Sequence, residues 1–218
     1  MSERRFGYPV ALDVTGRLAV VIGREAVAMG KAESLLAAGA YVHVVASGPG
    51  SRLDRLESNA DVTVARRGYR PEDLDGAFLV VASSADPAVR EDIFRQARAR
   101  GALVNVMDDI HHCDFAAPAV VRRGDLTIAV STGGGSPALA RRLREQLETQ
   151  FGQEWSELLE VLRDVRSETL TGLSDLAERS RRWQTALDTD ELIGLVRAGR
   201  IDEARSVLRD RLLREGVA

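Results

Sequence analysis

The stretch that decides the fold spans residues 18–36 and reads LAVVIGREAVAMGKAESLL. Its apolar start, Leu18–Ile22, stops at Gly23, and an apolar-periodic segment follows. A strand, a tight turn and a helix in this order open the βαβ unit that binds dinucleotides. Gly23 allows the sharp turn, and the helix N-terminus after it is suited to a pyrophosphate. The cofactor-binding residues predicted in this turn are Gly23, Arg24, Glu25, Ala26 and Val27.

The glycine fingerprint of such turns is incomplete in this chain. In the pattern G-x-G-x-x-G/A, Gly23 and Ala28 fit the first and third positions, but Glu25 replaces the middle glycine. A carboxylate about 4 Å from a phosphate costs roughly 1 kcal/mol in bulk water and about 4 kcal/mol at an effective dielectric near 20. Glu25 could swing outward, and Arg24 could compensate for its charge. On this motif alone, a dinucleotide site and a βαβ unit that binds nothing are equal alternatives.

Composition restricts the class of protein. The chain has 218 residues, of which 44% are hydrophobic, enough for one large or two small domains. A net charge of -3 gives no general reason to expect nucleic acid, and the single cysteine suits a reducing compartment. No signal peptide is recognisable, and no apolar run approaches the roughly 20 residues of a membrane span. We therefore expect a soluble, cytoplasmic protein that binds neither nucleic acid nor membrane.

Apolar runs and helical patterns alternate from residue 10 to residue 107. This alternation predicts an α/β fold with a Rossmann-like, doubly wound parallel sheet. A short lead-in strand is expected at residues 8–12. The strands of the sheet are expected at residues 18–22, 41–46, 62–65, 77–82 and 102–107.

The pattern changes after Asp109. Two β runs flank a polar turn, at residues 116–121 and 126–131, and a helix is expected from residue 138 to about 151. From residue 153 onward nearly all of the chain has helical periodicity. Breaks in this periodicity fall at Gly172, at residues 188–190 and at residues 199–200. The sheet is therefore expected to be followed by a small α+β segment and a C-terminal helical region.

Several segments together carry a likeness to a known family. They are PVALD at 9–13, the turn above with Lys31, EDLDGAFLV at 72–80 with SADP at 84–87, NVMDD at 105–109 with CDF at 113–115 and PA at 118–119, and AVSTGGGSPALAR at 129–141. In this order and spacing the chain, over about residues 8–165, resembles the precorrin-2 dehydrogenases. These are stand-alone enzymes or N-terminal modules of siroheme synthase, and some are also sirohydrochlorin ferrochelatases.

The resemblance implies an activity, a cofactor and an assembly. Family members are NAD-dependent oxidoreductases that convert precorrin-2 to sirohydrochlorin in siroheme biosynthesis, and some then insert Fe²⁺. They form homodimers through the segment after the nucleotide-binding domain. The proposed catalytic aspartate of the family falls on Asp108, and in bifunctional members it is also implicated in chelation. The expected domains are a NAD-binding domain at 1–112, a dimerisation and substrate-site segment at 113–151, and a helical domain at 152–218.

Further cofactor and catalytic residues are expected where strands end. Asp108 lies just past the fifth strand, at the sheet edge where ligands bind in open α/β folds. A carboxylate there could take a proton from a reduced tetrapyrrole, whereas without the family match a helix or turn cap would be the simpler role. Ser47 stands where an acidic residue often contacts the ribose. Ser83 and Ser84, after the fourth strand, complete the predicted cofactor site.

The substrate is a polycarboxylate, so backbone N–H groups and cations are expected around it. The predicted substrate-binding residues are Thr132, Gly133, Gly134, Ser136 and Arg141. Two alternatives remain. The glycine-rich run could form only a tight loop at the dimer interface, and at least half of the neighbouring arginines could be solvated surface.

Residues 111–114, His-His-Cys-Asp, suggest a metal site. Consecutive residues cannot easily converge on one ion, so no dedicated metal site is predicted. Ala85 and Arg90 depart from the family pattern beside the nucleotide crevice, as Glu25 does. These departures support an alternative function: a relative with impaired NAD binding that acts as a sirohydrochlorin chelatase or a non-catalytic tetrapyrrole-binding protein.

Overall fold

The computed structural model describes residues 6–169 and 176–213. The chain divides into two compact units, Met1–Ala117 and Pro118–Ala218. The break predicted at Gly172 lies outside the described residues. Within the described ranges, no helix combines the length and the apolar character needed to cross a membrane.

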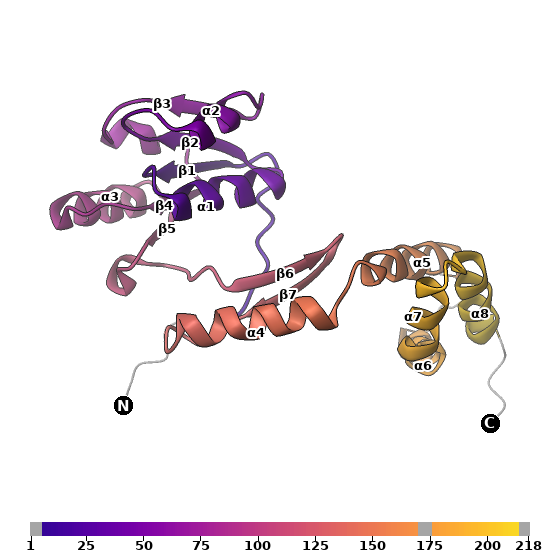
Figure 1. The fold of residues 1–218 in the computed structure, drawn as a ribbon. Helices are drawn as coiled ribbons and strands as arrows, with labels where there is room; N and C mark the ends of the chain where they lie inside the picture. The colour runs from indigo at the N-terminus through magenta and orange to yellow at the C-terminus, as the bar shows by residue number, and fades with distance from the viewer. Residues whose placement is uncertain (1–5, 170–175, 214–218) are drawn as a thin grey trace. The chain divides into compact units, whose positions relative to one another are not determined.

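The first unit is built on one parallel sheet (Figure 1). Its strands lie in the order β3-β2-β1-β4-β5, so the strand order reverses beside β1. The five strands are β1 (Leu18–Ile22), β2 (Tyr41–Val45), β3 (Val62–Ala65), β4 (Leu79–Ala82) and β5 (Leu103–Val106). The connecting helices are α1 (Ala26–Ala37), α2 (Ser51–Glu57) and α3 (Pro87–Ala99), with short 3₁₀ turns η1 (Pro71–Leu74) and η2 (Ile110–His112). The predicted doubly wound sheet is confirmed.

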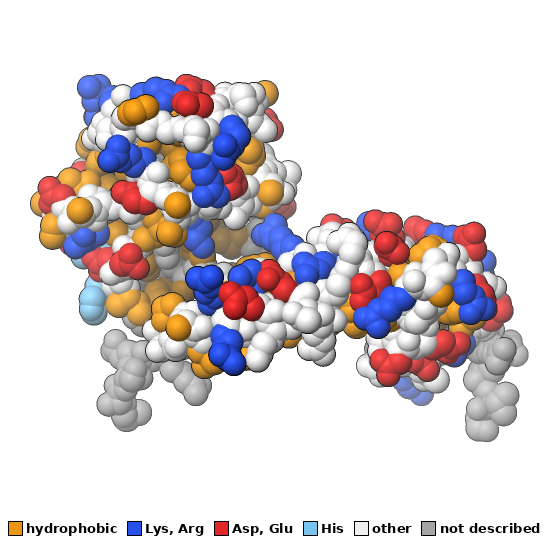
Figure 2. Space-filling view, in the orientation of Figure 1, with side chains coloured by type: hydrophobic (Ala, Val, Ile, Leu, Met, Phe, Trp, Pro, Cys, Tyr) orange, Lys and Arg blue, Asp and Glu red, His pale blue; other side chains and the backbone are white. Residues whose placement is uncertain are grey.

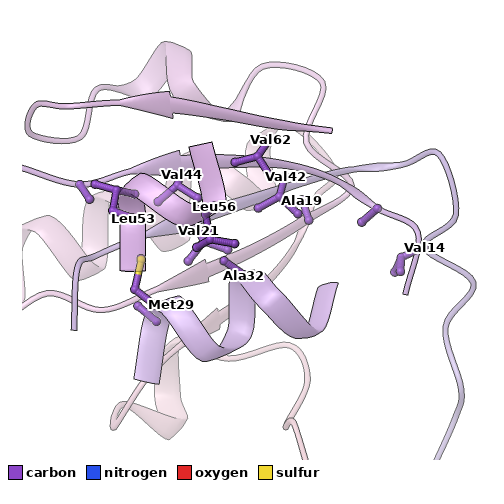
Figure 3. Packing of buried hydrophobic residues seen from close by; sticks show 13 residues of the cluster. Val14, Ala19, Val21, Met29, Ala32, Val42, Val44, Leu53, Leu56 and Val62 are labelled. Carbon is purple, nitrogen blue, oxygen red and sulfur yellow. The ribbon is translucent and has the colours of Figure 1, made fainter. Parts of the chain in front are cut away.

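Helices bury both faces of this sheet, which explains the nearly continuous apolar runs of the central strands. Along β1, Val21 packs with Met29 of α1 and Leu53 of α2 in one cluster (Figure 3). The neighbouring Val20 faces the other side and packs in a second cluster, with Ile93 of α3. Because side chains alternate along a strand, β1 and β2 contribute to both cores.

The lead-in strand predicted at residues 8–12 is wrong. This segment joins neither sheet, and Tyr8 and Val10 are 86% and 61% exposed. Both sides of β1 are already occupied, by β2 and β4, and Pro9 has no backbone N–H to offer a neighbouring strand. The apolar character of residues 8–12 alone is therefore not sufficient for a strand.

The second unit begins with an antiparallel hairpin, β6 (Ala119–Arg123) and β7 (Leu126–Val130), as the sequence predicts. Helix α4 (Pro137–Gln150) packs against both strands. The remaining helices are α5 (Glu154–Thr169), α6 (Leu176–Ala186), α7 (Thr189–Arg197) and α8 (Ile201–Leu213). Gly199 ends α7 at φ 71°, as predicted for the break at residues 199–200.

Helices α5 to α8 share one hydrophobic core. Leu158, Leu192 and Leu208 are its largest fully buried side chains. The indole rings of Trp155 and Trp183 pack against this core from partly buried positions. On the face of the molecule shown in Figure 2, basic and acidic side chains are interspersed over both units. Ion pairs such as Arg209–Glu168, 2.6 Å apart, link neighbouring helices.

Candidate functional site

A cavity of about 310 Å³ lies at the carboxyl edge of the first unit's sheet, beside the strand-order reversal. Open α/β sheets bind their ligands at this position. Six of the predicted cofactor residues line it: Gly23, Arg24, Glu25, Ser47, Ser83 and Ser84. Ala26 and Val27 are not among its lining residues, because they already form the first turn of α1, where Val27 is 63% exposed.

Among the lining residues that sequence reasoning missed are Arg67, Gly68 and Tyr69. They follow β3, which neighbours β2 in the sheet. The rule that ligands bind beyond the carboxyl ends of strands could have indicated them, but only with the strand order known. Arg67 is fixed by two hydrogen bonds to Asp73, with N···O distances of 2.8 and 2.6 Å.

Gly23 is required by the turn between β1 and α1. Its φ is +126°, and a Cβ there would lie 3.0 Å from the Ser83 Cβ and 3.1 Å from the Ser83 carbonyl oxygen. A side chain would therefore collide with the loop after the adjacent strand β4. The absence of a side chain lets the β1 and β4 ends approach each other, which forms the floor of the cavity.

Glu25 does not swing away from this turn. Its Oε2 accepts a hydrogen bond from the Arg24 backbone N–H at 3.1 Å, and lies 2.8 Å from the position of a Cβ on Gly23. The same side chain makes no capping hydrogen bond to α1. The carboxylate therefore takes up a backbone donor that a pyrophosphate would use in a dinucleotide-binding turn.

Arg24 extends across the mouth of the cavity to the loop after β2. Its Nη1 lies 3.2 Å from the position that a Cβ on Gly48 would occupy. Gly48 follows Ser47 directly, so the guanidinium lies beside the residue expected near the ribose. The side chains of Arg24 and Glu25 thus point in different directions from the turn.

Asp108 lies where the sequence predicts, two residues beyond β5 at the same sheet edge. Its φ is +60°, a left-handed conformation that costs an L-residue about 1 kcal/mol and that Asp and Asn tolerate best. The side chain is exposed. Asp109, rather than Asp108, precedes η2 as its N-cap, and its carboxylate makes no capping hydrogen bond. The capping role considered for Asp108 is therefore not seen, and strain at an exposed acid is typical of functional sites.

A network of charged side chains lies next to Asp108. Asp109 Oδ2 is 2.7 Å from His112 Nδ1, and His112 Nε2 is 2.6 Å from Glu91 Oε2. The Arg90 guanidinium donates to Asp109 Oδ2 at 3.3 Å. The hydrogen bond to Asp109 raises the pKa of His112, and the same bond lowers the pKa of Asp109. Sequence reasoning noted Arg90 and His112 separately and missed their connection.

The histidine and cysteine run has structural contacts of its own. Both ring nitrogens of His112 are engaged by carboxylates. The Cys113 thiol is buried and donates to the carbonyl oxygens of Val106 and Asp109, each at 3.2 Å. Across residues 6–169 and 176–213, no three His, Cys, Asp or Glu side chains are grouped so as to hold a metal ion.

The predicted substrate residues form one loop in the second unit, with Arg141 on the helix behind it. Thr132 Oγ1 donates to the Ser136 carbonyl oxygen and accepts from the Ser136 N–H, both at 3.1 Å. Ser136 Oγ caps α4 by accepting from the Leu139 N–H at 3.2 Å. Gly133 and Gly134 have φ of +60° and +85°. Arg141 is 77% exposed and pairs with Glu145 on the same helix at 2.9 Å.

Comparison with known proteins gives the family. A family model described as putative NAD(P)-binding matches residues 10–119. The chain belongs to this NAD(P)-binding family. A second model, described as sirohaem biosynthesis protein central, matches residues 123–150 of this family member. The NAD cofactor predicted from the sequence agrees with the first match.

Curated relatives of this NAD(P)-binding chain are siroheme synthases. That of Photorhabdus laumondii subsp. laumondii is 32% identical over 204 residues, covering 94% of this chain and 43% of that protein. That of Pseudomonas paraeruginosa is 36% identical over 204 residues, covering 94% and 44%. The chain thus spans less than half the length of these relatives. The predicted resemblance to siroheme synthases is confirmed.

A solved structure shows the same fold. SirC, described as a precorrin-2 dehydrogenase, matches with a TM-score of 0.71 and 24% identity, covering 93% of this chain and 99% of that one. The match confirms the predicted fold class, a Rossmann-like sheet with a helical C-terminal region.

The cavity fits a dinucleotide in three respects and opposes it in one. Gly23 has no side chain, so the turn between β1 and α1 comes close to the end of β4. Helix α1 begins at this turn without a side-chain cap. Serine residues lie at the ends of β2 and β4 and line the cavity. The opposing feature is the Glu25 carboxylate. Because a glutamate side chain rotates freely at an exposed turn, we expect it to move when a pyrophosphate binds.

Proposed function

We propose that the chain is an NAD-dependent precorrin-2 dehydrogenase, which oxidises precorrin-2 to sirohydrochlorin in siroheme biosynthesis. One observation carries this proposal: the cavity and the strained Asp108 lie at the same carboxyl edge of the sheet. The reaction needs a hydride acceptor and a proton acceptor side by side. The NAD(P)-binding family and the siroheme synthase relatives support the same activity.

The residues of the cavity hold the cofactor in this proposal. The turn at Gly23 and the N-terminus of α1 bind the pyrophosphate through backbone N–H groups. Ser47 hydrogen-bonds the ribose, while Ser83 and Ser84 line the opposite wall. Bound NAD⁺ supplies the acceptor for the hydride.

Asp108 is the proton acceptor in this proposal. Its carboxylate takes a proton from the macrocycle as the hydride leaves, so that no positive charge accumulates on the product. The oxidation removes one hydride and one proton from the macrocycle, and Asp108 then passes this proton to water. Asp108 is exposed and has a left-handed backbone, a strained conformation that is often found at functional sites.

The second unit is proposed to bind the substrate carboxylates. Backbone N–H groups of Thr132, Gly133 and Gly134, the Ser136 loop end and Arg141 are suited to carboxylates. We also propose a cytoplasmic homodimer that assembles through residues 113–151, and insertion of Fe²⁺ into sirohydrochlorin as a second activity. The division into domains at 1–112, 113–151 and 152–218 belongs to the same proposal.

The direct test is conversion of precorrin-2. Purified protein is incubated with NAD⁺ and precorrin-2 without oxygen, and sirohydrochlorin and NADH are followed by absorbance. We expect both products in equal amounts from wild type, and their formation at least about a hundredfold more slowly from Asp108→Asn. The proposal fails if wild type forms no sirohydrochlorin while an established dehydrogenase does so in the same mixture.

A second candidate function is favoured by the position of Glu25. A carboxylate already bonded to the Arg24 N–H competes with a pyrophosphate, as expected of a relative with impaired NAD binding. Such a protein would act as a sirohydrochlorin chelatase or as a non-catalytic tetrapyrrole-binding protein. Saturable sirohydrochlorin binding without NAD⁺ binding would support it, and micromolar NAD⁺ binding would contradict it.

A further inference from the structure

The side chains of Arg90, Glu91, Asp109 and His112 form a continuous chain of hydrogen bonds, here called the His112 network. His112 stands at its centre, between Asp109 at 2.7 Å and Glu91 at 2.6 Å. Arg90 joins it through Asp109 at 3.3 Å. The side chains of Arg90, Asp109 and His112 are only 24%, 18% and 24% exposed, so these contacts are partly shielded from water.

This network connects two loops at the ligand-binding edge. Arg90 Nη1 donates to the carbonyl oxygens of Ser84 and Ala85, at 2.8 and 3.3 Å, in the loop between β4 and α3. The same guanidinium holds Asp109, in the loop after β5. One loop contributes residues of the cofactor cavity and the other contributes Asp108. Arg90 thus fixes the two loops relative to each other.

The network also restrains the backbone of the residues that follow Asp108 in the chain. The Asp109 N–H donates to the Val106 carbonyl oxygen at 3.2 Å, which closes a tight turn around Asp108. The His112 N–H donates to the Asp109 carbonyl oxygen at 3.1 Å, so His112 grips Asp109 through both main chain and side chain. A left-handed residue persists only where its surroundings over-determine it.

We propose that Arg90, Asp109 and His112 are positioning residues that hold the Asp108 carboxylate, for proton transfer, at the sheet edge that also carries the cofactor cavity. This inference rests on the proposed dehydrogenase function. It extends that function to residues that do not themselves touch the reacting atoms. It also explains Arg90, which departs from the family pattern: its guanidinium makes the bridge between the two loops.

The surroundings of His112 favour its protonated form. From α3 it faces the Glu91 carboxylate, the Arg90 guanidinium and the edge of the Phe94 ring, 5.1 Å between centroids. Arg98 lies over that ring and 3.7 Å from Asp114. From its own segment it faces Asp109. Hydrogen bonding to Asp109 raises the pKa of His112, so the charged form of the network is favoured below that raised pKa and weakens as pH rises through it.

The test compares His112→Gln with the matched control His111→Gln, since His111 is the exposed neighbour in the sequence. Misplacement of a catalytic group by about 1 Å costs up to about a hundredfold in rate. We therefore expect His112→Gln to lower kcat by tenfold to a hundredfold with a near-normal KM for NAD⁺. We expect the wild-type rate to decline at alkaline pH as His112 loses its proton, and His112→Gln should lack this decline. His111→Gln should match wild type in both respects.

A readout without activity separates this inference from the proposed function. Hydrogen exchange of residues 107–113 should accelerate in His112→Gln and stay unchanged in His111→Gln. Unchanged exchange together with a normal kcat and pH profile in His112→Gln would overturn the inference. Wild type that forms no sirohydrochlorin would refute the dehydrogenase instead, while the exchange data would still show whether the network holds the Asp108 turn.

Discussion

The Glu25 carboxylate accepts a hydrogen bond from the Arg24 backbone N–H, with 3.1 Å between Oε2 and the nitrogen. A negatively charged group therefore already occupies part of the turn where the family places the pyrophosphate. Binding of NAD⁺ must break this hydrogen bond and move the carboxylate. The affinity for NAD⁺ should then depend on this one side chain more than on any other residue of the turn.

Glu25→Gly should bind NAD⁺ more tightly than wild type. Removing a repulsion of about 1 to 4 kcal/mol raises the affinity at least about fivefold, and calorimetric titration measures it. Glu25→Gln keeps the length of the side chain without its charge and separates repulsion from steric exclusion. If all three proteins bind NAD⁺ equally, the carboxylate is irrelevant to the cofactor. If none binds, the defect extends beyond Glu25.

Asp108→Asn should abolish most of the oxidation without weakening the cofactor complex. An amide cannot take a proton from the macrocycle, and loss of a general base lowers kcat by about 10²-fold to 10⁴-fold. Steady-state kinetics gives kcat, and titration of NAD⁺ serves as the control for an intact cavity. A variant that retains more than a tenth of the wild-type kcat would show that another group accepts the proton.

The left-handed backbone conformation of residue 108 should affect the free energy of unfolding of variants at this position. Asp108→Ala and Asp108→Gly both remove the carboxylate, but only glycine adopts φ +60° without strain. We expect the free energy of unfolding of the alanine variant to be about 1 kcal/mol below that of the glycine variant. Urea denaturation followed by circular dichroism measures the difference. Equal stability of the two variants would mean that the turn relaxes to an ordinary conformation.

We expect the ionised Asp73 carboxylate to increase the free energy of unfolding, and this contribution to be lost at low pH. Its nearly buried carboxylate accepts two hydrogen bonds from Arg67, and these bonds chiefly lower its pKa. Because the folded-state pKa lies below the unfolded value of about 3.9, this contribution is complete above that value and is lost as pH falls through the folded-state pKa.

The variant Asp73→Asn tests this contribution. We expect its free energy of unfolding to fall by about 1.5 to 3 kcal/mol at neutral pH, the usual range for hydrogen bonds to charged groups. Its stability should also depend less on pH in acid than that of wild type. Asp61→Asn, at an exposed position of the same unit, is the control. A variant with the same acid dependence as wild type would contradict the assignment.

Leu208→Ala should destabilise the helical part of the second unit. Leu208 is fully buried among helices α5 to α8, and such truncations cost about 2 to 5 kcal/mol. Leu213→Ala, on the same helix at a 61% exposed position, should cost under about 0.5 kcal/mol. Thermal unfolding followed by circular dichroism compares them. Equal losses in the two variants would contradict the burial pattern of α8.

Periodicity predicted the parts of the fold that depend on local pattern. The run Leu18–Ile22, the turn at Gly23 and the helix after it were predictable because each element follows from its own residues. The edge on which Asp108 lies followed from the rule for parallel sheets. The prediction of a strand at residues 8–12 failed for a related reason: a short apolar segment becomes a strand only when a neighbouring strand is available to pair with it.

The sequence did not predict the contacts of the candidate site in which side chains from different loops meet. The sequence predicts that Glu25 lies in the turn and carries a charge. It does not predict the direction of the Glu25 side chain, because this direction depends on the three-dimensional contacts of the turn. Arg90 and His112 lie on different elements, and their connection through Asp109 requires the packing of α3 against η2. Arg67 reaches the cavity only because β3 neighbours β2.

Both tryptophans of the chain, Trp155 and Trp183, pack in the helical core of the second unit, while the proposed cofactor cavity belongs to the first. Their emission overlaps the absorption of reduced nicotinamide, so bound NADH would act as an energy-transfer acceptor for donors in a separate unit. The efficiency of this transfer would report the separation of the two units in solution. Because both indole rings lie in the second unit, the distance between the units is measurable by energy transfer without an attached dye.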